Sequence, residues 1–240
     1  MHRRGRAVRI KRLEKPEPMT KRKLGIFAGL IFVAAFASLA NAATISYYID
    51  QSNSDPLLPD NVNYLQVTIS DSAFGLDPNA IRFDVTLLAP LTSIAGSNFG
   101  IQSFGFNTTQ STAAVLAAIA GLPGGWSKSI NTNQDGFGNF ELVDSGTGSN
   151  RQNPTLTFYI SGIAGDVVAD YAVLSTGNAG QANTFFAAHV AGFLDQDPGP
   201  DELSSAFFGG STPVVPVPAA VWLLGSALGV LGVLRRRDRA

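Results

Sequence analysis

Three segments of the chain alternate between apolar and polar residues. The alternation is clearest at residues 65–70, 81–87 and 155–160, and it gives each segment one apolar and one polar face. A period of two is typical of antiparallel strands with one buried face, so we predict a strand at each segment. Weaker patterns predict further strands at residues 99–106, 137–143, 167–174 and 184–193.

One segment has the pattern of a short helix. Ser111 or Thr112 can cap the start of residues 113–120, and Gly121 and Pro123 follow as stop signals. Clusters of Gly, Asn, Asp and Pro separate the predicted elements and favour turns. About seven to nine short strands with one short helix predict a mainly β fold, an antiparallel β-sandwich of jelly-roll or immunoglobulin-like type.

Residues 1–42 have the pattern of a secretory signal. Basic residues at 21–23 precede an apolar stretch at 24–40, which is the order found in signal peptides. An uncleaved membrane anchor is the alternative, because this stretch reaches the roughly 17 residues that a span needs. Met19 opens a conventional signal, so a translation start there is a second hypothesis for this region. The cleavage site predicted for signal peptidase consists of small residues: Ala40, Ala42 and Ala43.

The C-terminal segment, residues 213–240, has the pattern of a membrane-spanning anchor. A proline-rich stretch leads into an uncharged run, and the apolar stretch from Val214 to Leu234 counts 21 residues. This length is enough to cross a bilayer, and a basic cluster after the span favours the cytoplasmic side. A buried core helix is the alternative. The cluster predicted to stop in the cytoplasm contains Arg235, Arg236 and Arg237.

The same segment contains Val215, Pro216, Pro218, Ala219, Ala220 and Trp222, followed by the rest of the uncharged run and the Arg cluster. In this order the residues resemble the PEP-CTERM sorting signal of secreted Gram-negative proteins. Val217 lies between the two prolines of the motif, where the name-giving form has Glu. The resemblance implies recognition by an exosortase, export through the inner membrane, a transient membrane anchor, and delivery to the cell surface or extracellular matrix. The family is associated with exopolysaccharide and biofilm matrix.

The net charge of −1 hides an uneven distribution. Residues 43–213 contain 15 acidic residues and three basic ones, a net charge of −12. Such an acidic domain repels phosphate backbones, so the charge argues against a nucleic-acid partner. The chain therefore divides into three predicted parts: a signal region at 1–42, an acidic β-rich extracellular domain at 43–212, and a sorting segment at 213–240.

The acidic domain offers little catalytic chemistry. The chain has no Cys, and the domain has one histidine, His189, which excludes thiol catalysis and thiolate or multi-histidine metal sites. A Ser-His-Asp triad around His189 would lack a Gly-x-Ser-x-Gly turn. In the predicted strand His189 lies on the face opposite Phe186, Ala188 and Val190, so we predict a histidine that faces water or a hydrogen-bond partner. Paired carboxylates can hydrolyse glycosides, but the 15 acids of the domain nominate no pair. We predict a non-enzymatic structural or adhesive protein of an exopolysaccharide or biofilm matrix.

One motif resembles half of a calcium-binding loop. Asn131, Asn133, Asp135 and Gly136 match its first half, but Leu142 stands where the twelfth-position Glu belongs. Calcium is one interpretation, and a β-turn between two strands is the other. We predict no other cofactor. A second group of acids lies in a Pro/Gly-rich segment, and a solvated loop, a cation site and a contact to the cell surface are its possible interpretations: Asp195, Asp197, Asp201 and Glu202.

A carbohydrate-binding module or weak glycan-active enzyme is the alternative function. In either case exopolysaccharide would be the partner of the acidic domain. Tyrosine and tryptophan side chains can stack on sugar rings, although core packing explains them equally well. The candidates are Tyr47, Tyr48, Tyr64, Trp126, Tyr159 and Tyr171.

Overall fold

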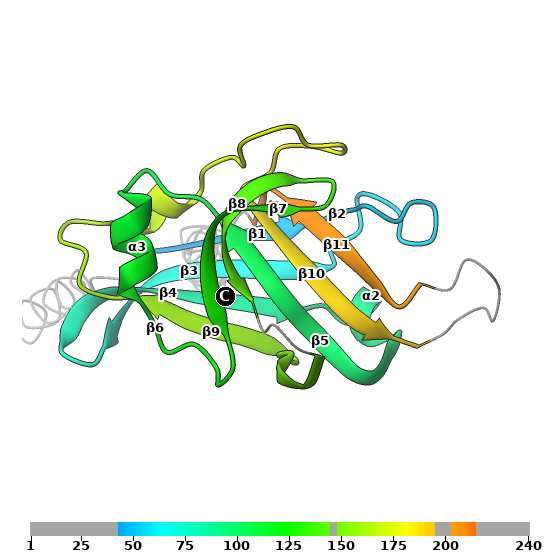
Figure 1. The fold of residues 1–240 in the computed structure, drawn as a ribbon, viewed down its shortest axis with the longest axis horizontal. Coiled ribbons are helices and arrows are strands. Elements are labelled where there is room, and N and C mark those ends of the chain that lie inside the picture. Colours follow the sequence, from blue (N-terminus) through cyan, green and yellow to red (C-terminus); the bar gives the residue numbers. More distant parts are fainter. Residues whose placement is uncertain (1–42, 145–147, 195–202, 215–240) are drawn as a thin grey trace, which may run out of the picture. The chain divides into compact units, whose positions relative to one another are not determined.

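The computed structural model describes residues 43–144, 148–194 and 203–214, which form two antiparallel sheets with few helices (Figure 1). The mainly β fold expected from the alternating segments is therefore confirmed. In spatial order, sheet A contains β12 (Thr212–Pro213), β1 (Thr44–Ile49), β3 (Leu65–Phe74), β4 (Asp77–Leu87), β9 (Thr155–Ile160) and β6 (Ile119–Ala120). Sheet B contains β2 (Gln51–Ser52), β11 (Ser205–Gly210), β10 (Phe186–Phe193), β5 (Ala95–Phe106), β8 (Gly138–Asp144) and β7 (Ser127–Gln134).

Short helices connect the strands. The predicted helix is confirmed as α3, and Ser111 is its N-terminal cap residue. It ends earlier than predicted because Ile119 is extended and pairs with Ile160 of β9. The amino group of Lys128 donates to the carbonyl oxygens of Leu116 and Ile119 and so satisfies the end of the helix. The helices are α2 (Ala89–Thr92), α3 (Thr112–Ala118), η1 (Gly148–Asn150) and η2 (Val168–Tyr171).

The three clearest alternating segments form the centre of sheet A. They correspond to β3, β4 and β9, and their apolar residues are buried while the polar residues between them are partly exposed. The weaker predictions at 99–106, 137–143 and 184–193 correspond to β5, β8 and β10, with ends that differ by a few residues. The period-two pattern therefore identified the inner and outer faces of β3, β4 and β9 correctly.

The predicted strand at 167–174 is wrong. The helix η2 forms there instead, and its two buried residues, Val168 and Tyr171, are three positions apart. A 3₁₀ turn places such residues on one side, whereas a strand would separate them. The carboxylate of Asp170 accepts the backbone N–H of Val167 at 3.1 Å, a local bond that competes with strand pairing.

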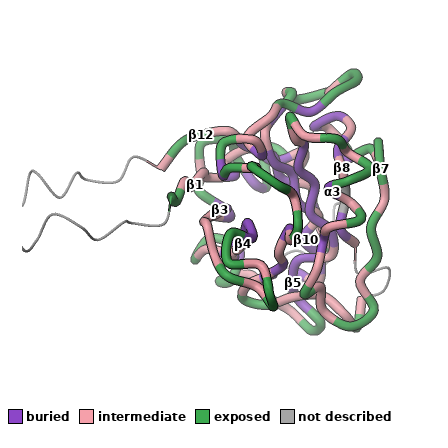
Figure 2. The backbone as a smooth tube through the Cα atoms, turned by 90° about the vertical axis from the view of Figure 1, so that its left-hand side faces the viewer, coloured by how far each residue is buried: buried purple, intermediate pink, exposed green. Residues whose placement is uncertain are grey.

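The inner faces of the two sheets share one hydrophobic core, seen as the buried segments in Figure 2. Phe83 of β4 stacks on Phe158 of β9, with ring centroids 4.7 Å apart. The ring of Phe83 also lies 5.1 Å from that of Phe106 in sheet B and 5.5 Å from that of Tyr171. Aromatic contacts of this kind add about 0.5–1.5 kcal/mol each to the effect of burial. Because the core occupies the inner faces, the outer face of sheet A holds polar residues, whereas the outer face of sheet B also carries a smaller apolar cluster.

No helix in the described parts of the chain is both long and apolar enough to span a bilayer. The predicted membrane segment, the basic cluster and the acids at 195–202 lie outside the described residues, as do Ala40 and Ala42 of the cleavage site. Ala43, the third residue of that site, is described and exposed.

Candidate functional site

The outer face of sheet A is polar across four neighbouring strands. The strand pairing aligns its side chains in three rows, for example Ser46, Thr68, Asp84 and Thr157 in the middle row. Residues two apart on a strand are about 6.8 Å apart and strands about 4.8 Å, so the surface spans about 14 Å in each direction. We call it the polar face, and it consists of Thr44, Ser46, Tyr48, Gln66, Thr68, Ser70, Arg82, Asp84, Thr86, Thr155, Thr157 and Tyr159.

Hydroxyl groups of the polar face bond to one another across the strands. The side-chain oxygens of Ser46 and Thr68 are 3.0 Å apart, and those of Thr86 and Thr155 are 3.1 Å apart. Such bonds fix the rotamers of short side chains. Each hydroxyl has one donor and two acceptor positions, so every pair keeps capacity for a further partner.

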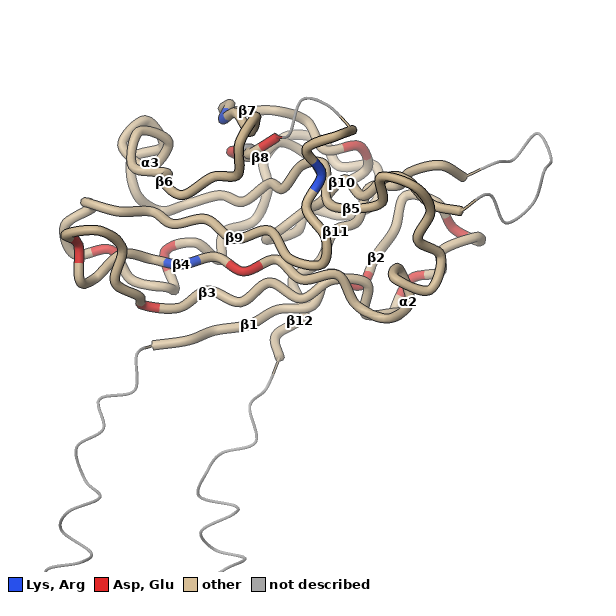
Figure 3. Tube along the Cα trace, turned by 90° about the horizontal axis from the view of Figure 1, so that it is seen from below, with Lys and Arg blue, Asp and Glu red and all other residues tan. Residues whose placement is uncertain are grey.

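An ion pair lies in the middle of the polar face. Nε of Arg82 is 2.9 Å from Oδ2 of Asp84, and Nη2 donates to Oδ1 at 2.9 Å. The hydroxyl of Thr157 donates to the same Oδ1 at 2.6 Å. The hydrogen bond to Asp84 raises the pKa of Arg82, so the guanidinium stays charged. In Figure 3 the basic and acidic positions adjoin on β4. The two charges cancel, and the polar face is neutral within an acidic domain.

An aromatic pair borders one end of the polar face. The ring of Tyr159 stacks on that of Phe74 from the end of β3, with centroids 4.3 Å apart and planes 27° apart. Both residues are partly exposed. Gly121 approaches both rings so closely that a β-carbon there would lie 3.0 Å from Tyr159. The close packing holds the pair in one orientation at the surface.

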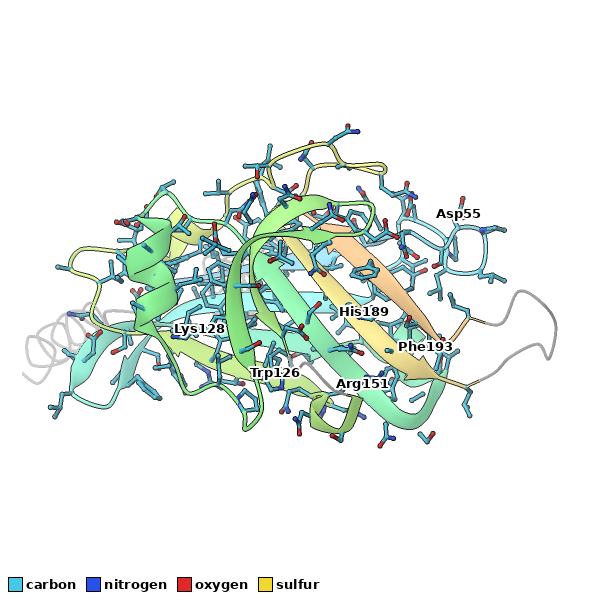
Figure 4. The ribbon with its side chains drawn as sticks, in the orientation of Figure 1. Asp55, Trp126, Lys128, Arg151, His189 and Phe193 are labelled. Atoms are coloured by element: carbon cyan, nitrogen blue, oxygen red, sulfur yellow. The ribbon has the colours of Figure 1, made fainter. Side chains whose placement is uncertain are left out.

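The outer face of sheet B carries His189. Its ring stacks on Phe207 of β11, with centroids 4.3 Å and planes 11° apart. The prediction that His189 lies opposite Phe186 is confirmed, because Phe186 is buried in the core and His189 is partly exposed. Burial lowers the pKa of His189, and the nearby charge of Arg151 lowers it further. Figure 4 shows His189 and Arg151 on the same side of sheet B.

Ser103, His189 and Asp144 share a row of sheet B, but not in the order of a catalytic triad. Strand pairing places Ser103 between the other two, opposite His189 on one side and Asp144 on the other. A triad needs the histidine between the carboxylate and the hydroxyl. The hydroxyl of Ser103 donates instead to Oε1 of Gln134 at 3.2 Å. The row therefore lacks the geometry that would activate a serine.

The three residues of the calcium hypothesis lie on the β7–β8 hairpin, where Asp135 forms part of the turn. The amide oxygen of Asn131 accepts a hydrogen bond from Asn139, and the amide nitrogen of Asn133 donates to Asn139. The carboxylate of Asp135 accepts the amide of Asn53 at 3.0 Å. In the described residues, no three acidic or histidine side chains are grouped to hold a metal. Calcium at this hairpin stays a prediction, which a rise in melting temperature in millimolar calcium would support.

A pocket of about 430 Å³ lies at the end of sheet A where the β3–β4 hairpin meets residues 162–167. Asp71, Asp77 and Asp166 line it together with Ile163 and other residues of the loop. Backbone N–H groups that bond to Asp77 lower the pKa of its carboxyl, whereas burial raises the pKa of Asp166. Neighbouring carboxylates thus have different environments at one end of the molecule.

The aromatic candidates divide between the core and the surface. Tyr64 and Tyr171 are buried, and Tyr47 packs against the core. The indole N–H of Trp126 donates to the carbonyl oxygen of Asn150 at 2.8 Å, so this polar group has a partner within the chain. The two remaining candidates, Tyr48 and Tyr159, lie on the polar face.

The sorting-motif residues from Val215 onward lie outside the described residues. Comparison of the chain with protein-family models, with curated proteins and with solved structures gives no match. The functional assignment therefore depends on the residues of this chain. The polar face is the surface that sequence reasoning missed. Its residues were visible as the polar half of each alternating segment, but not their alignment across the strands.

Proposed function

We propose that the chain is an exported, surface-sorted protein with a structural or adhesive role in an exopolysaccharide or biofilm matrix. The observation that carries this proposal is the extent of the sheets. β1 begins at Thr44, directly after the predicted cleavage site, and β12 ends at Pro213, directly before the sorting motif. Every described strand thus lies between the predicted cleavage position and Val215, the first residue of the sorting motif, so a chain that keeps residues 43–214 keeps all the described strand pairs.

The two ends of the domain leave from the same sheet edge. Tyr47 of β1 pairs with Pro213 of β12, and the backbone N–H of Val214 donates to the carbonyl oxygen of Ser46 at 2.8 Å. The sequence continues with Pro216 and Pro218, which have no N–H to donate, so it favours an extended spacer after the paired residues. A domain attached to the membrane by such a spacer would be released by a single cut in the sorting segment.

We further propose an immunoglobulin-like sandwich rather than a jelly roll. The neighbouring strands β3-β4-β9 in sheet A correspond in order to strands A-B-E of that fold. The neighbouring strands β11-β10-β5-β8 in sheet B correspond to strands G-F-C-C′. The nine-strand form of the immunoglobulin fold also adds strands next to C. Such sandwiches serve mainly as scaffolds and binding modules, which agrees with a non-enzymatic role.

The test removes the sorting segment. Cells producing the full chain are compared with cells producing a chain that stops after Val214, and membrane, surface and medium fractions are separated. We expect the full chain in the envelope or on the surface, and the truncated chain free in the periplasm or medium. A second variant replaces Arg235, Arg236 and Arg237 with Gln and should be retained less well in the envelope, because these residues form the predicted cytoplasmic stop. If the truncated chain partitions like the full chain, the sorting proposal is wrong.

The mature ends are measured in the same experiment by mass spectrometry. We expect an N-terminus at Ala43 and a C-terminus within the sorting segment in cells that contain the sorting enzyme. Cells that lack it should retain the intact C-terminal segment in the membrane fraction. An intact C-terminus in both strains would contradict exosortase processing.

A further inference from the structure

We infer that the polar face of sheet A binds an uncharged polysaccharide of the matrix. This inference deepens the proposed function, because it names the class of partner and the surface that contacts it. The middle of the surface contains the one ion pair found among the described residues, Arg82 with Asp84, and hydroxyl groups surround it. The face offers fixed donors and acceptors over an area about 14 Å wide.

The charge of the polar face selects a neutral partner. Residues 43–213 have a net charge of −12, which repels anionic polymers. The two charges of the polar face cancel at close range, because Nη2 of Arg82 donates to Asp84 and Nε lies 2.9 Å from its other carboxylate oxygen. An anionic glycan would meet no unpaired cation on this face, since Arg82 is already held by Asp84. A neutral glycan is not repelled by the acidic domain and needs no free cation.

The hydrogen-bonding groups of the polar face match the hydroxyls of a sugar. Seven of the twelve residues are Ser or Thr, and the bonded pairs Ser46–Thr68 and Thr86–Thr155 keep free donor and acceptor positions. Because these pairs are fixed before binding, little rotamer entropy remains to be lost. The stacked rings of Tyr159 and Phe74 supply an apolar surface at one end, suited to the C–H side of a sugar ring.

The same features disfavour a protein partner. Interfaces between proteins depend on a few buried aromatic or Arg anchors surrounded by apolar contacts. The polar face has no aliphatic side chain of the Leu, Ile, Val or Met type, and its one arginine is paired within the face. A glycan requires neither feature, because hydroxyl contacts and a stacking ring carry its recognition.

The experiment measures retardation of the full chain in native gels that contain hydroxyethylcellulose, galactomannan or alginate. We expect retardation by at least one of the two neutral polymers and none by alginate. Retardation by alginate alone, or by no polymer, overturns the inference. Sorting is measured separately by fractionation, so a failure here leaves the export proposal standing.

Variants locate the surface. Tyr159→Ala should weaken binding about tenfold, because it removes the stacking ring, and Tyr159→Phe should retain it. Thr86→Val with Thr155→Val keeps shape and strand propensity but removes two hydroxyls, and should weaken binding by about two- to tenfold per hydroxyl. Trp126→Ala, on a residue outside the polar face, is the matched control. Melting temperatures show that each variant folds. If Trp126→Ala abolishes binding and Tyr159→Ala does not, the polar face is not the site.

A second inference comes from an independent contact at the start of β1. The backbone N–H of Ala43 donates to Oδ2 of Asp71 at 3.0 Å, and the N–H of Asp71 donates to the carbonyl oxygen of Ala43 at 3.0 Å. We propose that Asp71 binds the new N-terminus created by signal peptidase. Hydrolysis of the Ala42–Ala43 bond adds hydroxyl to Ala42 and hydrogen to the nitrogen of Ala43, which then takes up a proton as an ammonium.

Cleavage strengthens the contact between the nitrogen of Ala43 and the carboxylate of Asp71. One neutral donor becomes a group with three donors and a positive charge, beside a carboxylate. Hydrogen bonds between charged groups are stronger than neutral ones. The contact would hold the first residue of β1 against β3 at the sheet edge from which the spacer also leaves. This inference rests on the proposed export, because it needs the cleavage.

The test compares two forms of the protein, each with and without Asp71→Asn. One form is processed, and the other carries Ala42→Leu to block cleavage; N-terminal sequencing verifies both. We expect Asp71→Asn to lower the melting temperature of the processed form more than that of the uncleaved form. Asp135→Asn, which removes a carboxylate bonded to the neutral amide of Asn53, should act equally on both. Equal effects of Asp71→Asn on both forms overturn the inference. Sequencing that shows no cleavage refutes the export proposal separately.

Discussion

The ring of Phe137 occupies the space above Gly209 of β11, where any other residue would place its β-carbon. Phe140 fills the corresponding space above Gly105 of β5, 2.8 Å from the position of an added β-carbon. These rings and Ala187 form a small second hydrophobic cluster on the outer face of sheet B. The β7–β8 hairpin, at one edge of sheet B, thus places two aromatic rings over the outer face of strands β5 and β11. The polar face of sheet A lies on the other side of the core.

Gly209→Ala should therefore destabilise the protein. The added methyl group overlaps the ring of Phe137, and inserting a carbon into a packed site costs about 1–3 kcal/mol. Denaturant unfolding measures the cost. In a Phe137→Leu background the clash is relieved, so the same glycine substitution should cost less, and the double-mutant cycle gives the coupling. An equal cost in both backgrounds would show that the ring is not what restricts this position.

Lys128→Met should loosen the junction between α3 and β6. The amino group donates to the carbonyl oxygens of Leu116 at 2.6 Å and Ile119 at 3.0 Å, and methionine keeps the length of the stem without the donors. Loss of these bonds from an exposed lysine should cost up to about 1 kcal/mol in the free energy of unfolding. Lys128→Arg, which retains donors and charge, is the control and should cost less. Unchanged stability of the methionine variant would contradict a capping role.

The fold could be predicted where apolar and polar residues alternate strictly along a strand, so that each face carries one kind of residue. In β4 the residues Ile81, Phe83 and Val85 alternate with polar ones, and all three are buried. β7 gave no such signal, because its sequence is almost entirely polar and most of its positions are exposed. Asn131 interrupts it with a positive φ of 50°. Edge strands of this kind are held by pairing with one neighbour, which the local sequence does not encode.

The candidate site was less predictable than the fold. Each strand of the polar face was identified alone, but the alignment of Arg82, Asp84 and Thr157 depends on the register between β4 and β9. A shift of one residue would bury these side chains and expose the core. The error at 167–174 also has a non-local cause: Asp170 accepts hydrogen bonds from Thr109 and Gln110 of a distant segment, and these contacts favour the turn of η2. Such non-local bonds leave no periodic trace in the sequence.

Asp77→Asn should destabilise the protein at neutral pH. The two carboxylate oxygens accept N–H groups of Asn79 at 2.9 Å and Gly162 at 2.6 Å, and an amide would direct its own N–H at one of them. These bonds lower the pKa of Asp77 below 3.8, so the stability they provide is present above that pH and is lost as the pH falls through the lowered pKa. Thermal melts between pH 2 and 7 measure the difference from the parent protein. A difference that does not shrink in acid would contradict this account.

Asp166→Asn should have the opposite effect. Burial raises the pKa of the Asp166 carboxyl above its usual 3.8, and the hydroxyl of Tyr171, which donates to it at 2.7 Å, offsets only part of that rise. A raised pKa means that the folded state binds the proton more tightly than the unfolded state. Its contribution to stability is therefore greatest below pH 3.8 and is lost as the pH rises through the raised value. Asparagine is uncharged throughout and still accepts the tyrosine hydroxyl. We expect the variant to melt at a higher temperature than the parent at pH 7, with the advantage vanishing near pH 3; an advantage that is constant across this range would show that ionisation of Asp166 does not oppose folding.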